Sequence, residues 1–321
     1  MDKRKRKYTP RRPGGTKPPA LRKKAYNLIV NEADFGFDPD QAAKLAQRLQ
    51  GRLRRSGWEC HTDRVDDWTD FEKTIGQAIR KNPFAIIVFG GDGSIRLAAS
   101  RISRAKGLLG IVPTGLHNNI FLSLFGHTDA EVALDIILAG YQTRIDAGQA
   151  NGTFFLGSLT AGLVYHMIYQ QGSKKLPRLA MSWAKMAGKA ADQTVPRTMT
   201  LKMDNHTFEA QPKILNIHLL SHVMTLPFVP AATPDDGRIV IVYDDNCPRD
   251  KITGFIRDLK KDKYQFLGKI KMVRGHRLSI SPAEGHTWMM DSEEVEFSGK
   301  EIVIEALHRA LRVFTNAPQK K

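Results

Sequence analysis

The first half of the chain alternates between short apolar segments and helical patterns. Ala25–Val30 and Phe84–Phe89 are short, largely apolar runs typical of buried strands. Between them, Pro39–Arg55 carries apolar residues at three- and four-residue spacings, namely Ala42, Leu45, Ala46, Leu49 and Leu53. Strands that alternate with helices in this way predict a parallel sheet with helical crossovers.

The same alternation continues to about residue 145. The pattern predicts further strands at Trp58–Val65 and Leu108–Val112, and further helices at Asp70–Arg80, Ser94–Ser103 and Thr128–Ala139. Residues 25–145 are therefore predicted to form an α/β domain. Ligands of such sheets bind beyond the carboxyl ends of the strands, where the most unusual loops of this chain fall.

After Ile145 the pattern changes to short strands separated by Gly, Asn and Asp turns. Thr153–Leu159, Thr198–Met203 and Ile214–Leu220 are examples, and two late strands are predicted at Glu301–Glu305 and Ala310–Phe314. This pattern is typical of a β-sandwich, predicted over residues 146–316, with a short tail at 317–321. A helix-rich insertion is predicted at Pro177–Ala191, within an otherwise all-β domain.

Length and charge agree with two domains and a basic tail. The chain has 321 residues, 41% hydrophobic, and a formal net charge of +16. Residues 1–24 hold eleven Lys and Arg residues against the single acid Asp2, together with Pro and Gly, and are predicted to be disordered. Such a tail attracts anionic lipid surfaces or serves as a solubilising extension. Apart from Tyr8 it lacks aromatic residues, so specific nucleic-acid recognition is not expected.

The cysteines and the lengths of the apolar runs predict the compartment. Cys60 and Cys247 are too few for a disulfide framework or a thiolate metal site, which favours a reducing compartment. The longest apolar run, Phe84–Phe89, is far shorter than the roughly 20 residues of a membrane span. A cytoplasmic protein is predicted, with peripheral attachment to the inner face of the membrane as an option.

A glycine-rich turn, Gly90–Ser94, joins a predicted buried strand to a predicted helix. Its backbone amides and the helix N-terminus can face an anion without obstruction by side chains. A carboxylate at Asp92 would repel a phosphate directly, but it suits Mg²⁺ or a hydroxyl, as phosphoryl transfer requires. The alternative is an ordinary tight strand-to-helix turn.

This turn resembles the GGDGT-type turn of diacylglycerol kinases, sphingosine kinases and NAD kinases. Pro113–Phe121 is similar to the next loop of that family, with Pro113, Gly115 and Asn118 in agreement. Pro230–Gly237 and Met290–Glu293 resemble two later motifs, PxAxxDDG and DGE. The motifs follow in the family's order, and the resemblance covers nearly all residues from Tyr26 to Asn316.

The resemblance implies a role for each of these positions. Around an ATP it would place Asn31, Thr62, Gly90, Gly91, Asp92, Gly93, Ser94, Arg96, Gly115 and Asn118. Asp92 would organise the Mg²⁺-nucleotide, and Asp291 or Glu293 would activate the acceptor hydroxyl. A structural Mg²⁺ site is implied at Asp235 and Asp236 with carbonyl groups near Thr233 and Arg238; the alternative for this loop is a plain β-turn.

The chain departs from the family at several of these positions. Arg96-Leu97 replaces the usual Asn-Glu pair, Leu116 replaces a threonine, Asn119 an aspartate and Ser292 a glycine. Each lost hydrogen bond to a charged group removes about 1.5–3 kcal/mol. Arg96 can compensate in part by pairing with phosphate. The second loop also resembles that of phosphofructokinases, whose sugar-activating aspartate corresponds to His117.

These observations predict a kinase that transfers the γ-phosphate of ATP to a lipid alcohol such as diacylglycerol, with a role in phospholipid metabolism. An apolar segment with interspersed lysines, Tyr165–Ala191, fits a membrane interface or a helix packed on the core. The alternatives are a kinase for NAD or another soluble alcohol, and a catalytically silent regulator that binds nucleotide or lipid. The oligomeric state is left open.

Overall fold

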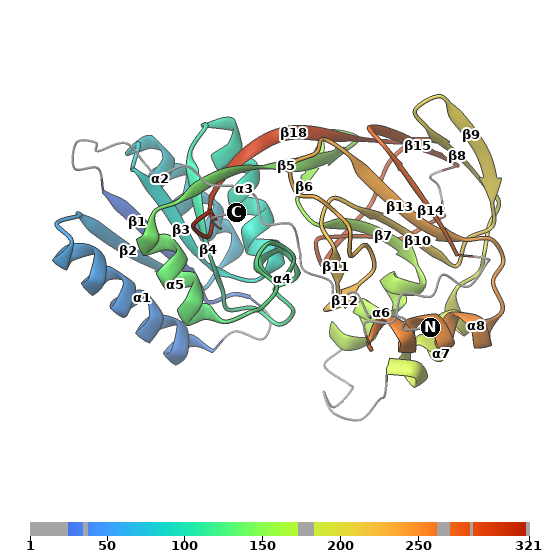
Figure 1. The fold of residues 1–321 in the computed structure, drawn as a ribbon, viewed down its shortest axis with the longest axis horizontal. Helices are drawn as coiled ribbons and strands as arrows, with labels where there is room; N and C mark the ends of the chain where they lie inside the picture. Colours follow the sequence, from blue (N-terminus) through green and yellow to red (C-terminus); the bar gives the residue numbers. More distant parts are fainter. Residues whose placement is uncertain (1–24, 35–37, 173–182, 262–269, 283–284, 319–321) are drawn as a thin grey trace, which may run out of the picture.

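The computed structural model describes residues 25–34, 38–172, 183–261, 270–282 and 285–318. The predicted tail at 1–24 and the first part of the predicted insertion, residues 177–182, lie outside these ranges. The described residues form two lobes (Figure 1). The predicted order of an α/β domain followed by an antiparallel β domain with helices is confirmed.

The first lobe alternates strands and helices as the pattern predicts. Its elements are β1 (Tyr26–Asn31), α1 (Pro39–Arg55), β2 (Cys60–Val65), α2 (Trp68–Arg80), β3 (Ala85–Gly90), α3 (Asp92–Arg104), β4 (Leu108–Pro113), α4 (Asn119–Phe125) and α5 (Ala130–Ala139). The strands are parallel in the order β2-β1-β3-β4.

Local signals fix the helix ends in this lobe. The Asp38 side chain accepts hydrogen bonds from the amides of Asp40 and Gln41, and Pro39 occupies the first turn of α1. The apolar stripe of α1 predicted from the sequence is fully buried against the sheet. The carboxyl ends of β1, β3 and β4 consequently lie at one edge, where the loops begin.

The second lobe packs two sheets face to face. Its elements are β5 (Gln142–Ala150), β6 (Thr153–Phe155), β7 (Ser158–Gly162), α6 (Leu163–Gly172), α7 (Trp183–Gln193), β8 (Met199–Met203), β9 (His206–Ala210), β10 (Ile214–His218), β11 (His222–Val223), β12 (Leu226–Pro227), β13 (Ile239–Asp244), α8 (Arg249–Leu259), β14 (Ile270–Gly275), β15 (Arg277–Ser281), β16 (Trp288–Met290), β17 (Glu293–Val295) and β18 (Ile302–Phe314).

One sheet of this lobe has the order β14-β13-β10-β7-β16-β17, and its inner face packs on the other sheet around Trp288. Its outer face is covered by α6, α7 and α8 through a separate apolar cluster. None of the helices in the described ranges is long and apolar enough to cross a membrane.

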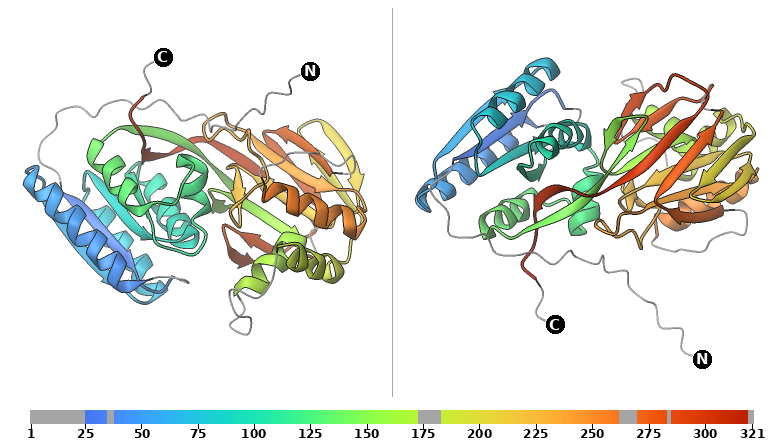
Figure 2. Two further views of the ribbon diagram at one scale, coloured as in Figure 1. Left: turned by 60° about the horizontal axis from the view of Figure 1, so that its bottom comes forward. Right: turned by 90° about the horizontal axis from the view of Figure 1, so that it is seen from above.

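Two long strands connect the lobes. β18 pairs in parallel with β4 of the first lobe and antiparallel with β15 of the second, so one sheet runs through both. β5 pairs with β18 along most of its length, and both strands cross from lobe to lobe (Figures 1 and 2). The predicted boundary at 145/146 falls inside β5, and the two predicted late strands are one strand with a register shift between Leu307 and Leu311.

Candidate active site

The two predicted loops come together at the carboxyl edge of the first sheet. β3 ends at Gly90, α3 begins at Asp92, and Gly91 between them is the helix N-cap. A Cβ on Gly115 would overlap the Cα of Gly91, so the loops pack backbone against backbone. The amide of Thr114 donates to the carbonyl of Gly90 at 3.3 Å. Glycine is required at positions 91 and 115 because the two backbones approach each other closely, and not because either residue has a positive φ.

Asn118 closes the second loop. Its side-chain oxygen accepts from the amide of Gly115 at 3.0 Å, and its side-chain nitrogen donates to the carbonyl of Gly115 at 2.9 Å. Asn118 is in the left-handed region at φ 52° and precedes α4. The predicted residues Gly115 and Asn118 therefore form the wall beside the glycine turn, while Leu116 between them is exposed.

Of the two predicted nucleotide-binding residues outside the loops, Asn31 lies beside the glycine turn and Thr62 lies within strand β2. The Asn31 side chain is fully buried, donates to the Ser94 hydroxyl at 2.8 Å and accepts from the amide of Ala33 at 3.1 Å. Thr62 pairs with Leu28 in the middle of β2, three residues before the strand ends. Its hydroxyl is buried and has no hydrogen-bond partner within the described ranges. Only Asn31 is in contact with the turn.

Asp34 is a residue of this site that the sequence analysis missed. Its Oδ2 accepts from the amide of Gly91 at 2.8 Å and from the Ser94 hydroxyl. A Cβ on Gly90 would lie 2.7 Å from the same oxygen. Burial raises the pKa of Asp34, and the charge of Glu293 raises it further. The protein's own carboxylate thus occupies the amide that the turn would offer to a phosphate.

Asp92 caps a helix of the neighbouring loop. Its Oδ2 accepts from the backbone and side-chain nitrogens of Asn119, and its Oδ1 accepts from the amide of Ile120, all at 2.9 Å. The Asn119 side-chain oxygen in turn accepts from the amide of Thr225 in the second lobe at 2.8 Å. Burial raises the pKa of Asp92 to about 6 although these bonds lower it.

Asp291 has its carboxylate engaged by backbone amides. It accepts from Leu156 at 2.7 Å and from Gly157 and Ser158 at 2.8 Å. Its side chain is buried, and burial raises its pKa. Asp291 has a positive φ of 45°, as does Ser292 at 73°. Asp291 therefore ties the turn between β16 and β17 to the segment before β7.

Glu293 is the acidic side chain that reaches the glycine turn. It forms an ion pair with Arg96 of α3, and a Cβ on Gly93 would clash with its Oε1. The Arg96 side chain is 15% exposed and that of Glu293 36%. The Nε of Arg96 is buried and has no hydrogen-bond partner in the described part of the chain. A cation and a carboxylate from different lobes thus meet at the turn.

A very small cavity lies between residues of the two lobes. It has room for about one water molecule and is bordered by Asp92, Asp291, Ser158, Ile168 and His222. Asp92 and Asp291 therefore face a common space, and the charge of Asp291 contributes to the raised pKa of Asp92. An acceptor molecule would have to widen this space on entry.

The loop predicted to hold a structural Mg²⁺ is occupied by arginines. Asp236 accepts from the amide of Arg238 at 3.0 Å and pairs with Arg274 at 2.5 Å, and Asp235 pairs with Arg309 at 3.0 Å. No cluster of three metal-ligating side chains occurs within the described ranges. Carboxylates already neutralised by arginine do not fit a divalent cation, so the Mg²⁺ role of Thr233, Asp236 and Arg238 gains no support here.

Comparison with known proteins identifies the family of the first lobe. The sequence profile of the diacylglycerol kinase catalytic domain matches residues 28–150. The first lobe is therefore similar to the catalytic domain of diacylglycerol kinases. This lobe contains the glycine turn, the loop of Asn118 and the Asp34 contact, and the match confirms the predicted family.

Relatives extend the similarity beyond the catalytic domain. The chain is 21% identical over 272 residues to a diacylglycerol kinase of Staphylococcus saprophyticus, covering 82% of this chain and 88% of that one. It is 23% identical over 195 residues to a diacylglycerol kinase of Staphylococcus aureus strain JH9, covering 60% of this chain and 62% of the relative. A crystal structure of a diacylglycerol kinase from Bacillus anthracis has the same fold, with a TM-score of 0.68, 17% identity, and coverage of 91% of this chain and 97% of that one. These similarities support the prediction of a phosphotransferase.

Neutralising Asp34 is expected to strengthen nucleotide binding to the catalytic domain. Two unit charges 4 Å apart repel by about 4 kcal/mol near a protein surface, and a phosphate at the Gly91 amide would meet the Asp34 charge at contact distance. We expect Asp34→Asn to lower the Kd of ATP in the absence of divalent cations by about tenfold or more, measured by isothermal titration calorimetry. The matched control is Asp66→Asn, an exposed acid of the same lobe. Weaker binding of metal-free ATP by Asp34→Asn would contradict this expectation.

The raised pKa of Asp92 predicts a pH-dependent stability. Between pH 3.8, the ordinary pKa of an aspartate, and about pH 6, the folded protein binds more protons than the unfolded chain does. The stability that protonated Asp92 contributes is therefore present at low pH and is lost as pH rises through 6. The full difference in pKa corresponds to about 3 kcal/mol in the free energy of unfolding. Urea unfolding should show wild type losing stability relative to Asp92→Asn from pH 4 to pH 6. The exposed variant Asp70→Asn should show no such trend; a flat difference for Asp92→Asn would refute the assignment.

Proposed function

We propose that this chain is an ATP-dependent kinase that transfers the γ-phosphate to a lipid alcohol such as diacylglycerol. The observation that carries the proposal is the contact of Glu293 with Arg96 and Gly93, which joins residues at least 197 positions apart. Phosphoryl transfer needs backbone donors for the phosphates and a carboxylate near the acceptor hydroxyl. The family match and the names of the curated relatives support the same reaction.

The donor phosphates would bind at the start of α3. The amides of the turn and the positive end of the α3 dipole favour an anion there. The buried Nε–H of Arg96, which has no hydrogen-bond partner among the described residues, is a further donor beside the turn. Because Asp34 already holds the Gly91 amide, binding requires that its carboxylate leave this position.

The residues around the turn fit a magnesium ion that arrives with the nucleotide. Mg²⁺ is commonly bound by substrate phosphates with one or two carboxylates, and Asp34, which has no arginine partner among the described residues, offers carboxylate oxygens beside the turn. The ion would supply neutralisation of the phosphate charge during transfer. Asp92 is less suited to bind it, because both of its oxygens accept bonds from the N-terminus of α4.

Of the two candidate bases, Glu293 is favoured. Its side chain is partly exposed and forms an ion pair with Arg96, whereas the Asp291 carboxylate accepts hydrogen bonds from three backbone amides. In this assignment Glu293 takes the proton of the acceptor hydroxyl. The hydroxyl oxygen forms the bond to the γ-phosphorus, the bond to the ADP oxygen breaks, and ADP leaves. Asp291 is a positioning residue that holds the β16–β17 turn.

A lipid acceptor fits the apolar surface near α6. Tyr169 of α6 is 59% exposed and Val195, just after α7, is 72% exposed. Exposed apolar side chains of this size are suited to contact acyl chains at a membrane surface. Ile168, next to Tyr169, borders the cavity that Asp92 and Asp291 share. A lipid could thus lie against α6 with its hydroxyl toward the transfer site.

A second candidate is a catalytically silent nucleotide-binding regulator. The observation that favours it is the Asp34 carboxylate at the Gly91 amide, together with Leu116, which cannot make the hydrogen bonds of the usual threonine. Such a protein would still gain stability from nucleotide, because any ligand of the folded state raises its stability.

Transfer of radiolabelled phosphate from Mg-ATP tests the proposal directly. We expect wild type to label diacylglycerol in mixed micelles. Glu293→Gln should lower kcat by about 100-fold or more, because general-base catalysis contributes roughly 10²–10⁴-fold. Arg96→Gln removes the same ion pair but keeps the base, so it should raise the KM for ATP more than it lowers kcat. Asp92→Ala serves as an inactive reference.

The same assay separates the alternatives. Labelling of NAD or another soluble alcohol without lipid would select a different kinase. Thermal stabilisation by ATP with no transfer to any acceptor would select the silent regulator. Equal kcat values for wild type and Glu293→Gln would overturn the assignment of the base.

A further inference from the structure

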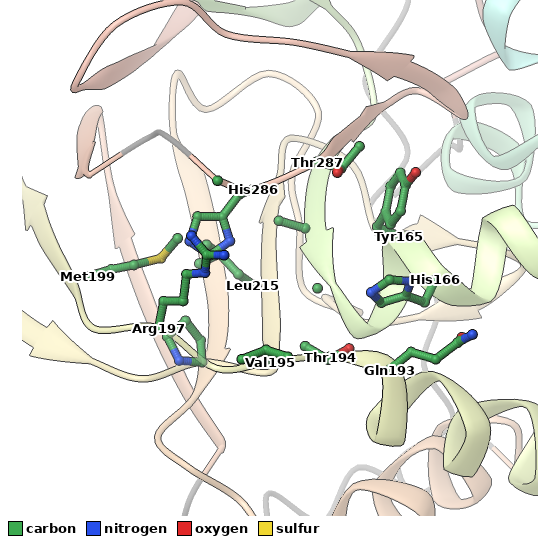
Figure 3. Close-up of a pocket in the computed structure, with 14 residues that line it drawn as sticks. Tyr165, His166, Gln193, Thr194, Val195, Arg197, Met199, Leu215, His286 and Thr287 are labelled. Atoms are coloured by element: carbon green, nitrogen blue, oxygen red, sulfur yellow. The ribbon is translucent and has the colours of Figure 1, made fainter.

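A pocket in the second lobe is separate from the transfer site. It has a volume of about 220 Å³ and is bordered by α6, by residues 193–197 and by residues 285–287 (Figure 3). Gly162, at one end of β7, lines it, whereas Ser158 at the other end donates to Asp291. A five-residue strand spans about 13 Å between its end residues. The pocket and the transfer site therefore lie at opposite ends of β7.

The lining of this pocket contains one guanidinium and two imidazoles. They belong to Arg197, His166 and His286, and no Asp or Glu is among the lining residues that the structure describes. The Arg197 guanidinium lies on the backbone of Gly285, where a Cβ would clash with its Nη1. Glu294, which hydrogen-bonds to Tyr165 at the edge of α6, is not part of the lining. A cavity with charges of one sign attracts the opposite charge.

Arg197 and His286 face each other, and neither forms an ion pair with an acid among the described residues. Figure 3 shows the guanidinium beside the imidazole, and after burial the charge of Arg197 is the second cause that lowers the pKa of His286. The His286 Nε2 is buried and has no hydrogen-bond partner in the described part of the chain. A buried polar atom without a partner costs about 1–3 kcal/mol. An anion between the two side chains would accept hydrogen bonds from Nε2 and from the guanidinium.

The size and floor of the pocket limit the ligand. Ala161, Met199 and Leu215 form an apolar floor continuous with the core between the sheets. Pockets for drug-sized ligands usually measure about 300–1,000 Å³, so this one suits a small ligand or a head group. A phosphate monoester carries three strong acceptor oxygens, which match the donors of one guanidinium and two imidazoles better than the two oxygens of a carboxylate do.

We propose that this pocket binds a phosphate monoester, held by Arg197 and His286, with the carbon skeleton of the ester on the floor of Met199 and Leu215. The ester is either a soluble metabolite or the head group of a phospholipid. The proposal concerns binding alone and does not depend on the kinase activity. It would give the chain a second ligand site that can respond to phosphorylated compounds.

Isothermal titration of the full chain in phosphate-free buffer tests this site. Glycerol 3-phosphate represents the soluble ester, phosphatidic acid in micelles the lipid, and glycerate the corresponding monoanion. We expect the phosphate ester to bind wild type and to bind Arg197→Gln and His286→Gln at least tenfold more weakly. Lys202→Gln removes one charge from an exposed position on β8 and should bind like wild type.

The outcomes decide between a site and a nonspecific attraction. If wild type binds phosphatidic acid but not glycerol 3-phosphate, and Arg197→Gln loses this binding, the ligand of the pocket is the head group of a phospholipid. Equal affinity of wild type and Arg197→Gln, equal affinity for glycerate and glycerol 3-phosphate, or no binding of either ester overturns the proposal. Circular dichroism and the stabilisation by ATP of each variant establish that the variants are folded and that the glycine turn is intact.

Discussion

The arrangement of the site depends on hydrogen bonds along β18. This strand pairs with β4 in one lobe and with β15 in the other, while β5 runs beside it across the junction. Backbone pairing over such a length resists bending between the lobes. Glu293 and Asp291, which belong to the second lobe, are consequently held at the glycine turn of the first. A flexible linker at the predicted boundary would not fix that distance.

Electrostatics at the turn differ from those of a plain phosphate loop. Asp34, Asp92, Asp291 and Glu293 gather near the turn, and Arg96 is the cation paired with one of them. Most of these carboxylates are stabilised by backbone amides rather than by positive side chains. An incoming polyphosphate therefore meets a largely negative environment, which makes the compensation of charge by a cation central to any transfer reaction here.

Secondary structure was predictable wherever a local signal existed. Helix α1 spans Pro39–Arg55 as predicted, because the Asp38 cap, Pro39 and the apolar stripe all act within one segment. The late strands were predicted as two, since polar residues around His308 and Arg309 interrupt the apolar pattern. The structure keeps them in one strand because Asp146 accepts from the amide of Arg309 at 2.7 Å and supports the irregular segment. Helix α4 was missed because its cap, Asp92, is 27 residues away in sequence.

The sequence by itself determined the order of the two domains and the glycine turn, since these depend on local composition and spacing. The motif around Asp291 was identified from its resemblance to a motif of known kinases. Only the tertiary structure decided which groups meet. The contact of Asp34 with Gly91 joins residues 57 apart, and the Arg197–His286 pair joins two loops of the second lobe. Such contacts are set by strand pairing and burial over long sequence separations, and no local pattern of residues encodes them.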